Sequence, residues 1–126
     1  MVEAEASAAI PFAHAIDRSC VAAATSPPPP LLLLLHGSGD NEHGLLDVGR
    51  ALAPSCGGAL ILSLRGPKAR GPFGYCWFEG TSASPAPDAE DSIGSAADAV
   101  LHLLASAPEA LGTDPERAYL FGHSRA

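Results

Sequence analysis

The chain has 126 residues, of which 47% are hydrophobic and 17% are charged, and its formal net charge is -7. This length fits one small domain, whereas enzymes with an α/β fold often need about 200 to 250 residues. The charge argues against a nucleic-acid partner, because phosphate binding needs clustered Lys and Arg, and the 7 in this chain are scattered.

Cysteine usage and hydropathy indicate the compartment. The 3 cysteines form no CxxC pair, which argues against a disulfide framework or a zinc site. No basic segment followed by a long apolar stretch opens the chain, so a secretory signal is not expected. The longest apolar run, LLLLL at 31–35, is far shorter than the about 20 residues that span a bilayer. The sequence therefore predicts a soluble, cytoplasmic protein without stable membrane insertion.

Residues 1–30 are predicted to form an N-terminal edge region. PFAHAIDR at 11–18 and CVAAAT at 20–25 are interpreted as an antiparallel pair of edge strands. SPPPP at 26–30 favours an extended polyproline II segment. This segment is either a stiff entry into the next strand, which is the preferred interpretation, or a docking motif for an SH3-type partner.

Residues 31–126 alternate between strand and helix patterns. LLLLL is followed by Gly37 and Gly39 and is too short for a helix, so it predicts a strand buried on both faces of a parallel sheet. GLLDVGRALA at 44–53 predicts a helix that the polar DNE turn before it can cap. The apolar side of that helix is expected to carry Leu45, Leu46, Val48, Ala51 and Leu52.

The second half of this region repeats the alternation. GALILSLRGP at 58–67 predicts a second strand, and a loop rich in glycine and proline with an aromatic cluster (Tyr75, Trp77 and Phe78) follows it. A helix is expected from the acids near Asp88 through Leu104, and a last strand at 118–121 that runs into Gly122. The order predicts an α/β fold with a mostly parallel sheet and flanking helices.

The last five residues, GHSRA at 122–126, fit a GxSxG-like pattern with Ala126 in place of the final glycine. A sharp turn between strand and helix needs small flanking residues and raises a serine hydroxyl above the sheet. Ser124 is therefore a candidate nucleophile, and the alternative is a surface serine.

LLHGSGD at 34–40 places a glycine turn at the end of the first buried strand. Backbone N–H groups in such a turn can stabilise the oxyanion of acyl transfer, together with the N–H of the residue after the nucleophile. The predicted donors are Ser38 and Arg125, with Gly37 as the fallback for Ser38.

Two other interpretations of this loop fail. A dinucleotide fingerprint would need glycine where Glu42 stands, and the lysine of a phosphate loop is absent as well. The spacing of His36, Asp40, Glu42 and His43 matches no metal site. We expect His36 to be a structural residue whose hydrogen bonds shape the loop.

LLLLLHGSGDNEHG, ALILSLRGP, the pair Trp77 and Phe78, and ERAYLFGHSRA occur in an order that resembles the phospholipase/carboxylesterase family of α/β-hydrolases, which includes the acyl-protein thioesterases. The resemblance covers residues 31–126, as a partial α/β-hydrolase domain. It implies that Ser124 hydrolyses carboxylic esters or acyl thioesters of small molecules or acylated proteins, without metal or cofactor. The two aromatic residues would line the acyl-binding surface or pack in the core.

The sequence also departs from that family. Glycine is usual where Ala126 stands, and an uncharged residue where Arg125 stands. In this fold the triad acid and histidine follow the serine, so both would lie past residue 126, and none of the five histidines of the chain is expected to replace them. We therefore expect an inactive fragment with an exposed apolar edge at 118–121 and poor solubility. The alternative is a non-catalytic binding module or pseudoenzyme.

Overall fold

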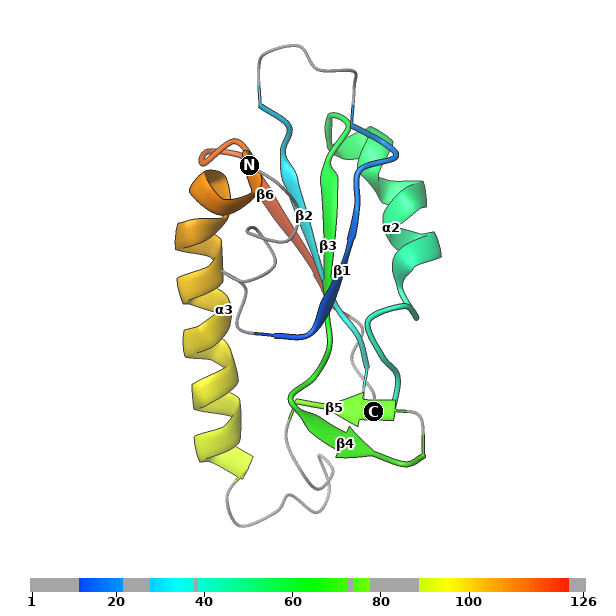
Figure 1. The fold of residues 1–126 in the computed structure, drawn as a ribbon, viewed down its shortest axis with the longest axis vertical. Coiled ribbons are helices and arrows are strands. Elements are labelled where there is room, and N and C mark those ends of the chain that lie inside the picture. Colours follow the sequence, from blue (N-terminus) through cyan, green and yellow to red (C-terminus); the bar gives the residue numbers. More distant parts are fainter. Residues whose placement is uncertain (1–11, 22–27, 38, 73, 78–88, 123–126) are drawn as a thin grey trace.

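The computed structural model describes residues 12–21, 28–37, 39–72, 74–77 and 89–122. Their elements, in chain order, are β1 (His14–Asp17), β2 (Leu31–Leu35), α2 (Leu46–Leu52), the 3-10 helix η1 (Ala53–Cys56), β3 (Leu60–Leu64), β4 (Lys68–Arg70), β5 (Gly74–Cys76), α3 (Ala89–Leu111) and β6 (Ala118–Gly122) (Figure 1).

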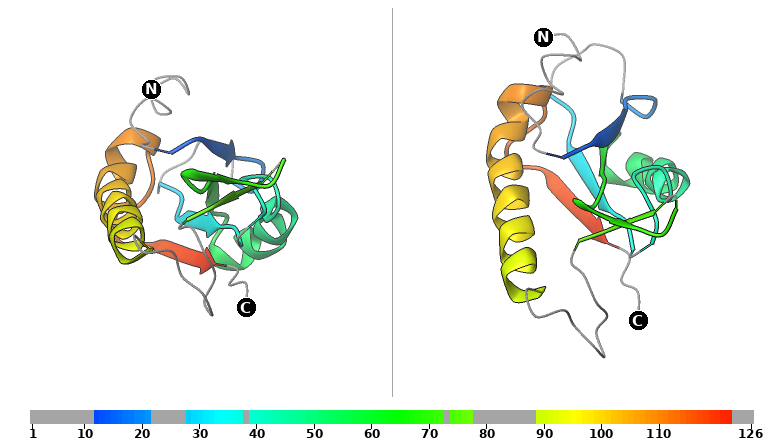
Figure 2. Two further views of the ribbon diagram at one scale, coloured as in Figure 1. Left: turned by 90° about the horizontal axis from the view of Figure 1, so that it is seen from below. Right: turned by 60° about the horizontal axis from the view of Figure 1, so that its bottom comes forward.

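In the described part of the chain, the main sheet has the strand order β1-β3-β2-β6. β2 runs parallel to both β3 and β6, and only β1 is antiparallel to its neighbour. Helix α3 covers one face of this sheet and α2 the other, so that the sheet lies between two helical layers (Figure 2). This arrangement confirms the predicted α/β fold with a mostly parallel sheet and flanking helices.

The five leucines of β2 form the centre of the core. Leu31 and Leu33 join the apolar cluster that includes Leu103 of α3, whereas Leu32 and Leu34 join the cluster on the α2 side. These four leucines are at most 2% exposed. Successive side chains of a strand point to opposite faces, so an all-leucine strand feeds both clusters, as the apolar run predicts.

Helix α2 approaches the sheet at a glycine. A Cβ atom on Gly49 would lie 2.7 Å from Cδ1 of Leu34, so a side chain at this position would require Leu34 or the helix to shift. Val48 is 38% exposed and Ala51 is also exposed, so their assignment to the apolar side of the helix was wrong. The buried positions follow a spacing of four around the glycine instead: Leu45, Gly49 and Ala53.

The DNE turn does not cap α2, contrary to the expectation. The N-cap residue is Leu45, and no side chain bonds to the free backbone N–H groups there. Asp40 Oδ1 accepts from the backbone N–H of Asn41 (2.9 Å), and Asn41 Oδ1 accepts from that of His43 (2.8 Å). These short-range bonds shape the turn itself, as Asp and Asn side chains commonly do.

Strand β1 pairs with β3, in the register His14 with Leu64. The expected partner at 20–25 was wrong where the structure describes it, because Cys20 and Val21 lie in a turn, and 22–25 fall outside the described residues. β1 therefore forms its backbone hydrogen bonds with the edge of the buried strand β3, because the turn that follows β1 offers no strand to pair with.

The described prolines of the SPPPP segment form a rigid entry into β2. Pro30 is buried, and its carbonyl accepts from Leu60 N (2.9 Å). The carbonyl of Pro29 accepts from Asp114 N (2.8 Å), and that of Pro28 from Arg117 Nη2 (3.2 Å). These contacts agree with the preferred interpretation of the segment.

Two features differ from the expected pattern in the second half. The predicted loop after β3 contains the short hairpin β4–β5, with Lys68 opposite Cys76. Helix α3 continues past Leu104 to Leu111 despite Pro108, and Gly112 follows it with φ +73°. Because proline is unfavourable in the interior of a helix, the sequence around Pro108 does not indicate the last turns of α3.

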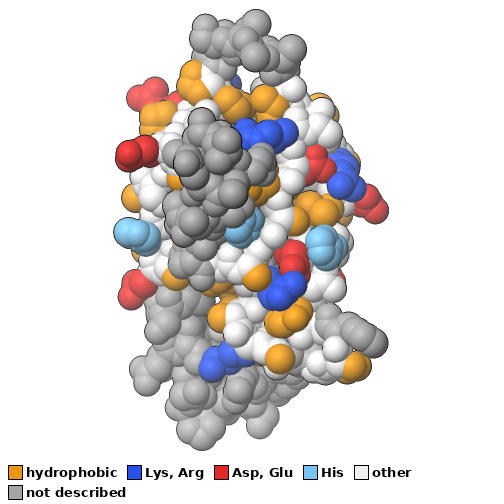
Figure 3. Space-filling view, in the orientation of Figure 1, with side chains coloured by type: hydrophobic (Ala, Val, Ile, Leu, Met, Phe, Trp, Pro, Cys, Tyr) orange, Lys and Arg blue, Asp and Glu red, His pale blue; other side chains and the backbone are white. Residues whose placement is uncertain are grey.

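The surface is mixed in charge. On the face seen in Figure 3, acidic side chains lie along the left edge, whereas acidic and basic side chains lie near one another at the centre and right. Among the described residues, no helix has the length and apolar character that crossing a membrane requires.

Candidate active site

The two motifs of the predicted site follow neighbouring strands. β2 and β6 pair in parallel with Leu35 opposite Gly122, so the chain leaves both strands at the same edge of the sheet. His36 and Gly37 follow β2 directly, and Ser124 comes two residues after the end of β6. The structure describes the strands that lead into both motifs, whereas Ser38, Phe78, Ser124 and Arg125 lie outside the described residues.

His36 has the structural role expected of it. It is 1% exposed, and the backbone N–H of Gly66 donates to its Nε2 (2.8 Å). Because Nε2 accepts, Nδ1 carries the proton and donates to the carbonyl of Gly37 (2.7 Å). Both ring nitrogens thus form hydrogen bonds with backbone groups, and the bond to Gly66 connects the end of β2 to the end of β3.

Trp77 stands against the same loop. Its Nε1 donates to the carbonyl of His36 (2.8 Å), and its ring lies 5.3 Å from the His36 ring. Phe12 contacts the indole edge to face, with ring centroids 5.7 Å apart. These contacts and partial burial against the α3-side cluster give Trp77 a packing role beside the loop.

The β4–β5 hairpin clamps the glycine loop, a contact that sequence analysis missed. The backbone N–H of Gly39 donates to the carbonyl of Tyr75 (2.9 Å), and that of Tyr75 donates to the carbonyl of Asp40 (2.8 Å). Gly66 allows the hairpin to lie close to the end of β3, because a Cβ atom on Gly66 would lie 2.5 Å from the carbonyl oxygen of Cys76. The loop that carries Ser38 is therefore held on both sides.

An ion pair lies next to this clamp. Arg65 Nε and Nη2 donate to the two carboxylate oxygens of Glu42, at 3.0 and 2.5 Å, and the Glu42 side chain is 5% exposed. The guanidinium also lies over the Tyr75 ring, 4.4 Å from its centroid. The hydrogen bonds from Arg65 lower the pKa of Glu42, and those to Glu42 raise the pKa of Arg65. Glu42 and Arg65 are 23 residues apart, so no local spacing indicates the pair.

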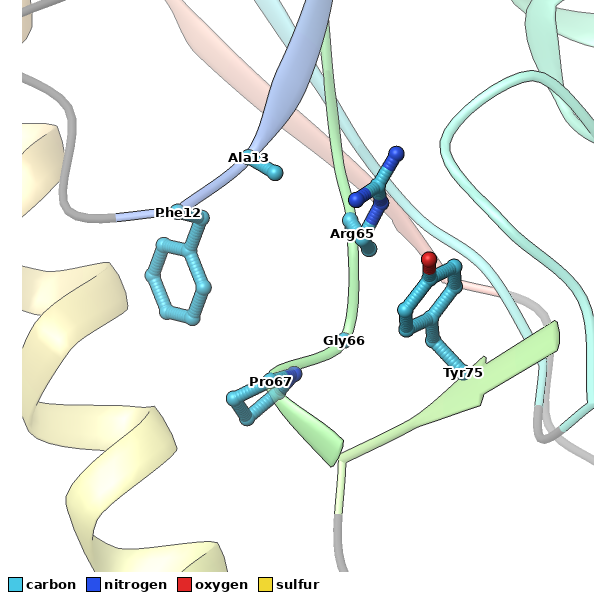
Figure 4. A pocket seen from close by; sticks show the side chains of 6 residues that line it. All are labelled: Phe12, Ala13, Arg65, Gly66, Pro67 and Tyr75. Atoms are coloured by element: carbon cyan, nitrogen blue, oxygen red, sulfur yellow. The ribbon is translucent and has the colours of Figure 1, made fainter. Parts of the chain in front are cut away.

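A cavity of about 340 Å³ opens beside the pair (Figure 4). It is lined by Phe12, Ala13, Arg65, Gly66, Pro67 and Tyr75. Trp77, the described residue of the predicted substrate-binding pair, does not line it, although it contacts Phe12. The cavity therefore touches the residues that hold the glycine loop.

The described histidines have different surroundings. His36 uses both ring nitrogens on backbone, and Nδ1 of His14 lies 2.7 Å from the carbonyl oxygen of Phe12. His43 and His102 are exposed on the turn after the loop and on α3. Within the described ranges, no group of three or more His, Cys, Asp or Glu side chains is placed to hold a metal ion.

Solved structures give the comparison. The carboxylesterase from Mesorhizobium loti matches 75% of this chain and 42% of its own, with 27% identity and a TM-score of 0.62. The Bacillus cereus carboxylesterase matches 90% of this chain and 48% of its own, with 20% identity and a TM-score of 0.66. The structure of YahD with malic acid matches 90% and 52%, with 24% identity and a TM-score of 0.54.

No protein-family model matches the chain, and no curated protein matches it in sequence. The chain spans about half the length of the solved structures that it resembles. The sheet order, the two helical layers and these neighbours together assign the chain the fold of part of an α/β-hydrolase.

Proposed function

We propose that this chain belongs to a serine hydrolase of carboxylic esters or acyl thioesters, in which Ser124 is the nucleophile. The observation that supports this proposal is the register of β2 and β6, which sets Leu35 opposite Gly122. Neighbouring strands lie about 4.8 Å apart, so the glycine loop and the serine turn begin side by side. Similarity to carboxylesterases agrees with this chemistry.

The proposed reaction is acyl transfer through the serine. Ser124 Oγ bonds to the carbonyl carbon of the ester or thioester as its proton passes to a base, and the backbone N–H groups of Ser38 and Arg125 hold the oxyanion. The C–O or C–S bond then breaks, and the leaving alcohol or thiol takes the proton. Water attacks the acyl-serine and releases the acid, so no cofactor takes part.

We also propose that these 126 residues alone are a poor catalyst. A serine hydroxyl without a base is a weak nucleophile, and both ring nitrogens of His36, the described histidine nearest to the predicted oxyanion loop in sequence, bond to backbone.

Three free cysteines, Cys20, Cys56 and Cys76, support a reducing, cytoplasmic location. The substrate would be a small ester or an acylated protein.

Labelling by a fluorophosphonate tests the nucleophile. The protein is purified from its native source, so that its natural length is present, and is compared with Ser124→Ala expressed in the same host. We expect the wild type to be labelled and Ser124→Ala to lose labelling by at least about 100-fold, because the probe needs an activated serine. Ser55→Ala, which changes an exposed serine on η1, is the matched control and should be labelled like the wild type.

Folded wild-type protein that takes no label would refute the assignment of Ser124. A non-catalytic binding module would then be the better interpretation, and its ligand binding should survive Ser124→Ala.

A further inference from the structure

The cavity is half open and has room for a small ligand. Its volume of about 340 Å³ falls in the range of small-molecule sites. Phe12 and Tyr75 stand on opposite sides of it, with Gly66 and Pro67 between them (Figure 4). Apolar surface from Phe12 and Pro67 thus faces a polar side made by Arg65 and Tyr75.

Arg65 presents hydrogen-bond donors in a fixed orientation. A guanidinium has five N–H groups, and of the described residues only Glu42 accepts from this side chain, at Nε and Nη2. Three N–H groups remain, two on Nη1 and one on Nη2, and the Arg65 side chain is 36% exposed. Because Glu42 and the Tyr75 ring hold the plane of the guanidinium, a ligand would not have to order it.

The chemistry of these donors favours a carboxylate. Glu42 offsets the charge of Arg65, so long-range attraction is weak, and recognition depends on short N–H···O contacts. Such bonds are stronger when the acceptor is itself charged, and Arg matches the planar geometry of a carboxylate. A neutral amide of the same shape offers one carbonyl oxygen without the charge and should bind less tightly.

The cavity adjoins the predicted oxyanion loop. Gly66, which lines it, donates to His36, and Tyr75, which also lines it, exchanges backbone hydrogen bonds with Gly39 and Asp40. A group bound in the cavity would therefore contact Gly66 and Tyr75, whose hydrogen bonds hold the loop before and after Ser38.

We propose that this cavity binds a free carboxylate group on a compact apolar or aromatic body, with Arg65 as the residue that recognises the charge. The preferred substrates of the hydrolase are then esters or thioesters that carry a second, ionised carboxylate. The substrate class rests on the proposed function, whereas binding of the carboxylate to the cavity does not.

Binding is measured on the Ser124→Ala protein, so that no turnover occurs. Phenylacetate and phenylacetamide, which differ in charge but hardly in shape, are titrated by calorimetry. We expect phenylacetate to bind about 10-fold more tightly, the difference between a charge-assisted and a neutral hydrogen bond. The added double substitution Glu42→Gln and Arg65→Gln should abolish this preference, since it removes both charges without leaving a buried carboxylate unpaired.

Two further variants separate recognition from folding. Ala13→Leu adds bulk at the wall of the cavity and keeps both charges of the ion pair, so it should weaken both ligands by at least about 10-fold. Ala51→Leu, at an exposed position on α2, should change neither affinity. Equal affinity for acid and amide, no binding at all, or a preference that survives the double substitution would overturn the proposal.

Hydrolysis is then compared on the protein with its serine. A dicarboxylic acid monoester should be cleaved with a lower KM than its diester, and this difference should vanish in the double variant. Carboxylate binding without cleavage of either ester would remove the proposed function and leave the binding site standing. Cleavage without carboxylate preference would do the reverse.

Discussion

His36 and Glu42 are both buried and polar, and they differ in how far sequence analysis foresees them. A histidine between a buried strand and a glycine turn has backbone groups within reach, so its structural role was predicted and is confirmed by its bonds to Gly37 and Gly66. Glu42 was considered only as an absent glycine or an unsuitable metal ligand. Its partner Arg65 comes from another strand end, and such a contact depends on the folded sheet.

The Glu42 carboxylate should make stability depend on pH. Its folded-state pKa is lowered from the ordinary 4.5 by hydrogen bonds from Arg65, so its contribution is complete above that pH and is lost as the pH falls through the folded value. We expect Glu42→Gln to lower the free energy of unfolding by about 1–3 kcal/mol at pH 7 and by progressively less toward pH 2. Urea denaturation across this pH range measures both.

Glu109→Gln, at an exposed position on α3, is the control and should leave stability nearly unchanged at each pH. A constant difference between Glu42→Gln and wild type from pH 7 to pH 2 would show that the charge of Glu42 is not what stabilises the fold.

The elements differ in how visible they are in the sequence. The strands at 31–35, within 58–67 and at 118–121 carry apolar runs of the right length, and the structure has strands there. β4 and β5 have 3 residues each, too few for any periodicity, and they lie in a region that composition marks as loop. The face of α2 was misjudged because Gly49 contributes no hydrophobicity yet marks the closest contact with the sheet.

Leu33 and Leu120 allow a matched test of the core. They are register partners in neighbouring strands, but Leu33 is 0% exposed and Leu120 is 58% exposed. Leu33→Ala should lower the free energy of unfolding by about 2–5 kcal/mol, because it removes buried contacts and leaves a cavity. Leu120→Ala should cost about 0.5 kcal/mol or less. Denaturant unfolding of the two variants side by side is the measurement, and similar losses would mean that β6 is covered in solution.

At the scale of the whole molecule, the order β1-β3-β2-β6 leaves two edge strands in the described sheet. The apolar edge at 118–121 was predicted from the sequence, and β6 indeed exposes 43% of Tyr119 and 58% of Leu120. The pairing of β1 with β3 was not, because nothing in a short four-residue strand specifies a partner 50 residues away. Edge strands with apolar side chains invite pairing with other chains.

Positive charge on this edge should therefore reduce self-association of the 126-residue chain. We expect the double substitution Tyr119→Lys and Leu120→Lys to raise the monomer fraction of the chain at a fixed concentration, measured by size-exclusion chromatography with light scattering. Leu101→Lys adds one positive charge on α3, where the leucine is 64% exposed, and should have a smaller effect than the single substitution Leu120→Lys on the edge. An equal gain from Leu101→Lys would indicate that net charge, and not the edge, limits solubility.

The composition of β2 has a consequence for how the sheet finds its alignment. A strand of five identical side chains carries no positional information, because a slip by one residue still places leucine at most of the same sites. Hydrogen bonds at the two ends of β2 fix its alignment with the neighbouring strands instead. Leu31 N donates to Arg117 O and the carbonyl of Pro30 accepts from Leu60, while His36 fastens the other end to Gly66. Pro30, which has no backbone N–H to donate, thus fixes the beginning of the central strand, and His36 fixes its end.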